Sequence, residues 1–443
     1  MLRRLLALLF LAGCATATTT QPPLAQKIDA LTAKFSHSLW GIDVEDEDGH
    51  RLYAKNAAQL FIPASNRKLF SGATAASCLG FERQLATDIF LDGHNLIVRG
   101  GGDPSLGGRW TFDRDALFAP VVDALRARGI GEIHAILADV SAFDRITIPP
   151  QWEIEDVGSS YAPPVDALAY NENVVGIFVD ECARPVVDTD PLFVDANANV
   201  GCGDGPPAIA SDVLNNVKLT GTLPSHFHSV NAITSPALYA AEALLSVLKH
   251  GGVVVHEFGM IDFARPYSDR IATIQSPPLW QLLSVVMKPS QNLYAEMLYK
   301  TAGGGTYDGA RAEERRFLTT EVGIDPAEFR FVDGSGVSAT NFVTPAAAVK
   351  VLRWMNDPAR RAAWWLILAT PGEEGTLHRR LVELAPRLRG KTGTLTGVNA
   401  LSGIVTGARG GTRYFTIFLN HHAAGSDEAQ KVIDAIAREI AAF

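Results

Sequence analysis

The pattern of helix and strand candidates changes twice along the chain, and this limits the folds that the chain can adopt. Residues 26–84 and the residues from 277 onward contain apolar-periodic segments typical of helices, with a few strand candidates. Residues 85–276 instead alternate short strand candidates with Pro, Gly and Asp turns. The sequence therefore predicts one domain formed by 26–84 and 277–443, interrupted by an inserted region, 85–276, of one or two mixed α/β subdomains.

The outer segments predict an α+β fold. A hairpin is expected from residues 38–44 and 51–53 around a polar turn, and the chain should end in a helix from Ser426 whose apolar residues share one face. A terminal helix packed on an antiparallel sheet is typical of the α+β class. The other helices expected here cover 26–35, 65–77, 278–287, 292–301, 309–322, 344–356 and 360–368, and the other strands cover 391–394, 403–405 and 413–419.

The inserted region should have its own small elements. Strands are expected at 86–91, 95–99, 133–139, 174–179 and 216–219, and helices at 114–128 and 236–249. The whole chain of 443 residues is 47% hydrophobic and 20% charged, which is a globular composition with material for two or three domains. Its net charge of −9 disfavours nucleic acid as a partner, because phosphate binding needs a basic surface.

The N-terminus carries an export signal. Arg3 and Arg4 precede a short apolar run, and Leu11-Ala12-Gly13-Cys14 resembles the lipobox of bacterial lipoproteins. We expect residues 1–13 to be a signal peptide, Cys14 to be lipidated, and residues 14–25 to form a tether. The sequence thus predicts an exported, periplasmic protein held at a membrane by its lipid; the alternative is an ordinary signal peptide that contains a cysteine.

The remaining cysteines fit an oxidising compartment. Cys182 and Cys202 lie in one loop-rich stretch, where we expect them to form a disulfide, whereas Cys78 in an apolar helical segment should be a buried free thiol. The sequence contains neither a C-x-x-C nor an H-E-x-x-H pattern. We therefore expect no metal site and no cofactor.

Three short motifs carry the chemistry, and the first supplies a nucleophile. Ser65 and Lys68 are separated by Asn66 and Arg67, so on a helix they share one face and the amine reaches the hydroxyl. A serine hydroxyl becomes a good nucleophile only when a neighbouring base removes its proton. Lys68 can do this if desolvation and a nearby cation, for which Lys391 is the candidate, lower its pKa.

The second and third motifs would hold a substrate. Ser290-Gln291-Asn292 lies at a loop–helix junction, and Lys391-Thr392-Gly393 should lie on an edge strand. Lys391 and Thr392 suit a terminal carboxylate, and Gly393 leaves room for a substrate backbone. The backbone N–H groups of Ser65 and Thr394 could form an oxyanion hole.

The motif patterns are short, so context has to select among them. Ser246 and Lys249 also match the first motif, and Ser229 and Asn231 match the second. Ser246, however, lies within an amphipathic helix, and Ser229 lies in a His-rich loop segment. Ser65 follows an extended lead-in that contains Pro63, which favours an exposed hydroxyl at a helix start.

Further segments carry a family resemblance. They are Asn56, Phe61-Ile62-Pro63-Ala64-Ser65, the stretch 100–106, Asp333-Gly334-Ser335-Gly336-Val337-Ser338, Asn341, Thr344-Pro345 and Gly375-Thr376-Leu377. With the three motifs, they make the chain similar to the class C low-molecular-mass penicillin-binding proteins, the D-alanyl-D-alanine carboxypeptidase/endopeptidase family. The resemblance implies a β-lactamase/transpeptidase-like domain, an antiparallel sheet with helices on both sides, split by a long insertion. It implies peptidoglycan stem peptides as substrates and β-lactams as inhibitors.

The resemblance also implies residue roles. Ser65 would be the nucleophile and Lys68 its base, while Ser290 would relay a proton to the leaving amine. Asn292 would hold the substrate backbone, and Lys391 with Thr392 would hold the D-alanine carboxylate.

Two departures and two alternatives stand beside this interpretation. Gln291 replaces the Asp that many members have, and Ala339 stands where Arg is common. The alternatives are a β-lactamase, which would need a dedicated deacylation base, and an inactive exported scaffold. Penicillin turnover distinguishes the first, and failure to bind labelled penicillin covalently distinguishes the second.

Overall fold

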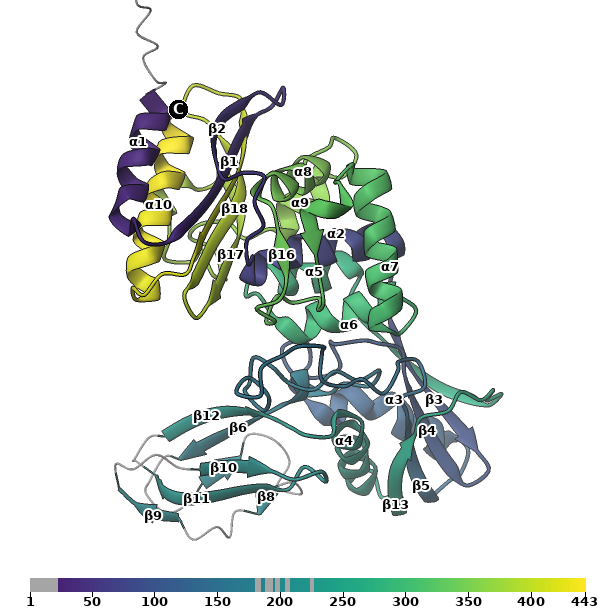
Figure 1. Cartoon of the computed structure of the whole chain (residues 1–443). Helices are drawn as coiled ribbons and strands as arrows, with labels where there is room; N and C mark the ends of the chain where they lie inside the picture. Colours follow the sequence, from purple (N-terminus) through teal and green to yellow (C-terminus); the bar gives the residue numbers. More distant parts are fainter. Residues whose placement is uncertain (1–22, 180–184, 188–193, 196–199, 204–207, 224–226) are drawn as a thin grey trace, which may run out of the picture.

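Both ends of the chain build the central sheet. The computed structural model describes residues 23–179, 185–187, 194–195, 200–203, 208–223 and 227–443. A five-stranded antiparallel sheet has the order β17-β18-β19-β1-β2. Strands β1 (Leu39–Asp46) and β2 (Arg51–Lys55) come from the start of the chain, and β17 (Leu388–Leu395), β18 (Val398–Thr406) and β19 (Thr412–Asn420) come from its end (Figure 1).

Helices cover both faces of this sheet. Helices α1 (Pro23–Thr32) and α10 (Ser426–Ala442) lie on one face, where Ile42 and Ile417 pack against Ile433 (Figure 1). The other face carries Ala400 and Phe418 in a core with α2 (Arg67–Leu79) and α8 (Pro345–Met355). Around α2 lie α5 (Leu279–Met287), α6 (Asn292–Ala302), α7 (Tyr307–Phe317) and α9 (Arg361–Ile367), and β15 (Phe329–Arg330) pairs with β16 (Phe342–Val343). The predicted α+β class, with helices on both sides of an antiparallel sheet, is confirmed.

The residues between α2 and α5 form separate sheets. The larger has the order β13-β5-β4-β3-β14 and packs against α3 (Arg114–Ala127) and α4 (Pro236–His250). Its strands are β3 (Ala86–Asp92), β4 (Asn95–Gly100), β5 (Glu132–Asp139), β13 (Val254–Ile261) and β14 (Arg270–Gln275). Smaller sheets contain β6 (Val174–Val179), β7 (Pro185–Val187) and β12 (Phe227–Ala232), and β8 (Val194–Asp195), β9 (Val200–Cys202), β10 (Ala208–Ser211) and β11 (Val217–Leu223).

Most expected elements are present, and the differences have local causes. The helix expected from Ser65 begins at Arg67, because a 3₁₀ turn, Ala64–Asn66, precedes it. The helix expected over 309–322 is α-helical only to Phe317 and then widens into a π turn. Strands β13 and β14 were not expected, since they are the edges of their sheet and their partial exposure removes the alternating pattern.

Several predictions fall on residues outside this description. The signal peptide, Cys14 and Cys182 belong to that group, so lipidation and the Cys182–Cys202 disulfide stay predictions. Cys78 is a free thiol on α2 as expected, although it is only half-buried. Burial and a hydrogen bond to Glu313 raise the pKa of Cys78 to about 12, so the thiol stays protonated. In the part of the chain that the structure describes, none of the helices combines the length and hydrophobicity needed to cross a membrane.

A buried ion pair fixes the start of α2. The Arg67 guanidinium donates to both oxygens of Glu314, at 2.6 and 2.8 Å, and its Nε donates to the Asp333 carbonyl at 2.8 Å. The Tyr299 hydroxyl also donates to Glu314 at 2.8 Å. Neither charged side chain is exposed by more than 2%. Loss of one partner would therefore leave an uncompensated charge in the core.

We expect Arg67→Met to lower the free energy of unfolding by about 3–5 kcal/mol, because Glu314 would remain buried without its partner. Urea denaturation measures this change. The exposed pair Arg126–Asp123 provides the control, and Arg126→Met should change stability by less than about 1 kcal/mol. An Arg67→Met variant as stable as the Arg126→Met variant would show that the buried pair does not fix α2.

Candidate active site

Ser65 is delivered by an anchored, extended segment. The backbones of Phe61 and Val343 exchange two hydrogen bonds of 2.9 Å, and the Asn420 side chain bonds both backbone groups of Ile62. The chain then turns through Ala64, which has a φ of 47°. Ala64 is buried, whereas Ser65 is partly exposed. The turn thus presents one hydroxyl from an otherwise buried segment.

The Lys68 amine has three hydrogen-bond partners. It lies 2.8 Å from Ser65 Oγ, 2.6 Å from Asn292 Oδ1 and 2.8 Å from the Ser335 carbonyl oxygen. The amide and carbonyl oxygens can only accept, whereas the hydroxyl can accept or donate. When Lys68 is neutral, its two N–H bonds stay on the two obligate acceptors. Its lone pair then faces the Ser65 hydroxyl, which is the geometry that a general base requires.

Burial makes the neutral form of Lys68 accessible. The side chain is fully buried, and desolvation lowers its pKa from 10.5 to about 7. Arg67 lowers it further, while Asp333 and Glu296 act in the opposite direction. With an ordinary pKa, roughly one molecule in three thousand would hold a neutral amine at pH 7. With the lowered pKa, about half of the molecules do.

The second motif joins α6 to the inserted region. Gln291 caps the helix by accepting from the Leu293 N–H at 2.7 Å, and it donates to Glu172 at 2.9 Å. Asn292 donates to the Tyr161 carbonyl at 2.7 Å while its oxygen accepts from Lys68. Glu172 also pairs with Arg109. An amide at position 291 can donate to Glu172, whereas an Asp there would oppose it with a like charge.

The third motif lies on β17, an edge strand of the central sheet. The buried Lys391 amine donates to Ser290 Oγ and to the Thr392 carbonyl, both at 2.8 Å. Burial, with the nearby Lys68 charge, holds the pKa of Lys391 well below its usual value. The Thr392 hydroxyl bonds the Thr376 hydroxyl at 2.7 Å. The Lys391 amine and two hydroxyl groups are thus available on and beside this strand, and a bound carboxylate would favour the protonated form of the amine.

Gly393 is required by the packing of the chain against itself. A Cβ at this position would lie 2.7 Å from the Pro63 carbonyl oxygen and 2.9 Å from the Asn66 amide nitrogen. Strand β17 therefore runs directly beside the turn that carries Ser65. Thr394 follows as an exposed residue of the same strand.

The structure brings the sequence-predicted residues together in two linked groups. Ser65, Lys68 and Asn292 form one hydrogen-bonded group, and Ser290, Lys391 and Thr392 form the other. The chain neighbours Ser290 and Asn292 join them. The competing matches are elsewhere, with Ser246 buried within α4 and Ser229 on β12.

Sequence reasoning missed the buried acids below this site. Glu296 and Asp333 are both fully buried, and both lie near enough to influence Lys68. Glu296 stands four residues after Asn292, so the two share a face of α6. A carboxylate on the buried face of an apolar helix was the available signal. Asp333 lies on the turn between β15 and β16, and its oxygens accept from the Gly336 and Ser338 N–H groups at 2.9 and 2.8 Å.

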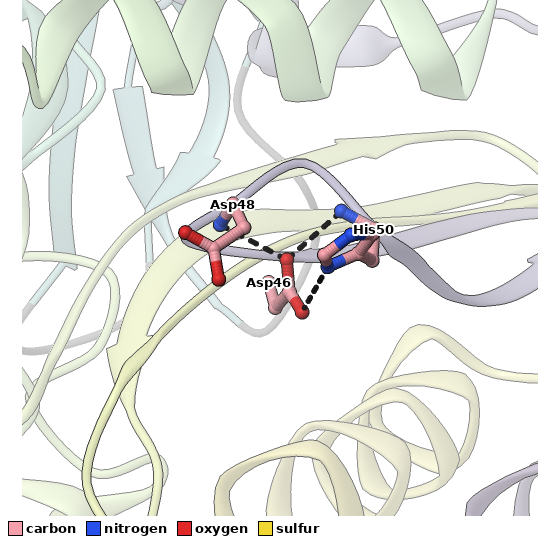
Figure 2. A group of neighbouring side chains, drawn as sticks. All are labelled: Asp46, Asp48 and His50. Carbon is pink, nitrogen blue, oxygen red and sulfur yellow. Dashed lines mark hydrogen bonds and ion pairs between the residues drawn. The ribbon is translucent and has the colours of Figure 1, made fainter.

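A separate polar cluster occupies the turn between β1 and β2. Figure 2 shows Asp46, Asp48 and His50, whose potential ligand atoms lie within 4.8 Å of one another. The Asp46 carboxylate accepts from the Asp48 and His50 backbone N–H groups at 3.0 and 2.9 Å and pairs with the His50 ring at 3.3 Å. These bonds close the turn and account for the arrangement without an ion.

Comparison with known proteins identifies relatives over nearly the whole chain. The model of the D-Ala-D-Ala carboxypeptidase 3 (S13) family matches residues 24–440. A D-alanyl-D-alanine carboxypeptidase of an Actinomadura species is 30% identical, with 90% of this chain and 80% of the relative covered. Penicillin binding protein 4 of Haemophilus influenzae has a similar structure, with a TM-score of 0.81, 22% identity and coverage of 94% and 99%. The same protein, solved in complex with a β-lactam, gives a TM-score of 0.75 at 22% identity, covering 93% of this chain and 98% of that one.

We expect the rate of Ser65 acylation by a fluorescent penicillin to follow the titration of Lys68. The rate constant should rise about fivefold from pH 6 to pH 7 and less than about twofold from pH 7 to pH 8, because the pKa of Lys68 is about 7. Stopped-flow or gel-based labelling over this range measures the profile. A rate that keeps rising about tenfold per pH unit up to pH 9 would contradict a lowered pKa.

Proposed function

This chain belongs to the D-Ala-D-Ala carboxypeptidase 3 (S13) family, and on that premise we propose that it cleaves peptidoglycan stem peptides at Ser65 through an acyl-enzyme. The chain is a serine-type hydrolase, a D-alanyl-D-alanine carboxypeptidase/endopeptidase of the penicillin-binding type. The observation that carries the residue assignment is the Lys68 amine, buried and 2.8 Å from Ser65 Oγ. Its other two acceptors leave the hydroxyl as the partner for its lone pair.

In the acylation step, Lys68 takes the proton of the Ser65 hydroxyl while Oγ attacks the carbonyl carbon of the penultimate D-alanine. The backbone N–H groups of Ser65 and Thr394 would hold the oxyanion. Ser290, bonded to Lys391, would pass its hydroxyl proton to the leaving nitrogen as the C–N bond breaks, and the proton that Lys68 took from Ser65 would return to Ser290, which leaves Lys68 neutral again. D-Alanine leaves in the carboxypeptidase reaction, and the amine of a cross-linked neighbour leaves in the endopeptidase reaction.

Substrate binding would use the groups on β17 and α6. Lys391, Thr392 and Thr376 would bind the terminal carboxylate, whose negative charge would favour protonation of the Lys391 amine. Asn292 has one amide hydrogen on the Tyr161 carbonyl, and its second remains for a substrate carbonyl. The inserted region, residues 85–276, would therefore form one wall of the binding site through Tyr161.

Deacylation completes the cycle. A water molecule attacks the acyl carbonyl and gives a proton to neutral Lys68, which passes it to Ser65 Oγ as the ester bond breaks and the shortened peptide is released. A β-lactam would acylate Ser65 in the same way through its ring amide. A β-lactamase would need a carboxylate that activates this water. The buried acids that influence Lys68, Glu296 and Asp333, instead accept from backbone N–H groups of the turn 333–338. Neither is directed at Ser65, which favours a slowly hydrolysed penicillin over the β-lactamase alternative.

We expect Ser65→Ala to abolish the release of D-alanine and the cleavage of cross-linked muropeptides, with a loss of more than about a thousandfold. Chromatography of muropeptides after incubation with the purified protein measures both products. Ser246→Ala is the matched control, because Ser246 has the same spacing to a lysine but lies buried in α4. A wild-type protein that releases neither product would favour the inactive scaffold.

The lipobox-like segment supports a place at the periplasmic face of a membrane. We propose that residues 1–13 are removed and that lipid is attached to Cys14, with the residues between Cys14 and α1 as the tether. The expected tether, 14–25, is too long, because α1 already begins at Pro23 and Leu24 is buried in the core. Wild-type protein expressed in a Gram-negative host should incorporate a clickable fatty acid and enter the detergent phase. Cys14→Ser should lose both properties, and Cys78→Ser should retain them. A wild type without label would indicate an ordinary signal peptide.

A further inference from the structure

The turn beneath Lys68 is held between two helices. From α2, Arg67, Lys68 and Ser71 donate to the carbonyl oxygens of Asp333, Ser335 and Gly334, at 2.8, 2.8 and 2.6 Å. Three consecutive carbonyl groups are therefore satisfied from one side.

Glu296 holds the other side of the same turn from α6. Its two oxygens accept from the Gly334 N–H at 3.0 and 2.9 Å, and one of them also accepts from the Ser335 N–H at 2.7 Å. Both contacts are buried, and both use Glu296 as an acceptor, which favours the ionised carboxylate. Burial and the nearby Asp333 charge act in the opposite direction and raise the pKa of Glu296 to about 7, so about half of the molecules carry the charge at neutral pH. No other described side chain has a recorded bond to these two N–H groups.

The two glycines of the turn fit this close packing. A Cβ at Gly334 would lie 2.8 Å from Tyr299 Cβ on α6. A Cβ at Gly336, whose φ is +86°, would lie 2.1 Å from the Ala64 carbonyl oxygen, immediately before the nucleophile. The turn is thus wedged between α6 and the Ser65 segment, with little freedom to shift.

We propose that Glu296 is a positioning residue that acts on Lys68 through the Gly334–Ser335 turn, a role that rests on the proposed function of Lys68 as the base. By fixing the Gly334 and Ser335 N–H groups, Glu296 holds the two peptide groups that precede the Ser335 carbonyl. The peptide of that carbonyl is held through the Gly336 N–H, which donates to Asp333 at 2.9 Å, so the two acids together set the direction of the carbonyl. That carbonyl is one of the two obligate acceptors of Lys68, so its direction decides where the remaining lone pair of the amine points. Without Glu296 the turn would lose this restraint.

Glu296 also acts on Lys68 through its charge. The negative charge favours the protonated amine, so it offsets part of the effect of burial on the pKa of Lys68. The other ionisable groups that influence Lys68 or Glu296 are Asp333 on the turn, Arg67 on α2, Lys300 on α6, Tyr307 on α7 and Lys391 on β17. A neutral residue at position 296 should therefore lower the pKa of Lys68.

Two substitutions separate the effect of the Glu296 side-chain length from the effect of its charge. Glu296→Gln keeps the length but removes the charge and places an amide N–H₂ against backbone N–H groups. Glu296→Asp keeps the charge but is too short to bond both N–H groups. We expect both variants to acylate with a fluorescent penicillin at least about tenfold more slowly at the pH plateau. Only Glu296→Gln should move the acid limb of the profile to lower pH, by at least about half a unit.

Tyr294→Phe is the control, because Tyr294 is buried on the same helix and its recorded side-chain bond is to Trp110, away from the turn. It should keep the wild-type acid limb and rate. If Glu296→Gln merely weakens the fold, its acid limb will coincide with the wild-type limb, and the proposal fails. If Glu296→Gln does not fold, an unchanged rate in Glu296→Asp also overturns the proposal. Ser65→Ala measured in parallel reports on the proposed nucleophile independently, since residual covalent labelling there would reject the function itself.

Discussion

The position of one buried amine organises the site. Lys68 is removed from water, yet it keeps three short hydrogen bonds, to a hydroxyl, an amide oxygen and a main-chain carbonyl. Each partner comes from a different part of the chain, namely the Ser65 turn, helix α6 and the turn 333–336. Because a buried amine without partners would be very costly, the fold must bring these segments together with small tolerances. The same burial lowers the pKa of Lys68, so the packing that stabilises the centre also makes it reactive.

The inserted region is coupled to this centre through the second motif. Three consecutive residues, Asn171, Glu172 and Asn173, have positive φ values of 49°, 55° and 56°. Such a run is strained for residues with side chains, and it directs Glu172 toward Gln291 and Arg109. The presence of Gln at position 291 is therefore explained by Glu172, because the Gln291 amide caps α6 with its oxygen and donates to the Glu172 carboxylate with its nitrogen. The departure from the family pattern changes a contact with the inserted region and leaves Ser290 and Asn292 in place.

Local sequence patterns predicted the candidate site residues better than they predicted the segments that hold those residues in place. Ser65 and Lys68, and Ser290 and Asn292, are close in sequence, so spacing alone places each pair, and helix periodicity predicted α2 and α6 nearly to the residue. The 3₁₀ turn before α2 could not be read from periodicity, since it depends on the anchoring of Ile62 by Asn420, far along the chain. Strands β13 and β14 were missed because most of their side chains are partly or fully exposed, so neither strand alternates between buried and exposed residues. The buried acids were missed because their partners are main-chain N–H groups and, for Asp333, also the Trp152 and Asn341 side chains, and the sequence around each acid does not identify these partners.

Helix α6 contacts Lys68, the turn beneath Lys68 and the inserted region. Asn292, Glu296 and Lys300 lie four residues apart and so share a face. Asn292 bonds the Lys68 amine, and Glu296 bonds the turn beneath that amine. Lys300 reaches the inserted region, where it donates to the Asp144 carboxylate at 2.7 Å and to the Ile146 carbonyl at 3.2 Å. Lys300 is fully buried, so its charge must stay paired with Asp144. One polar face of a largely apolar helix thus ties together the Lys68 amine, the turn beneath it and the inserted region.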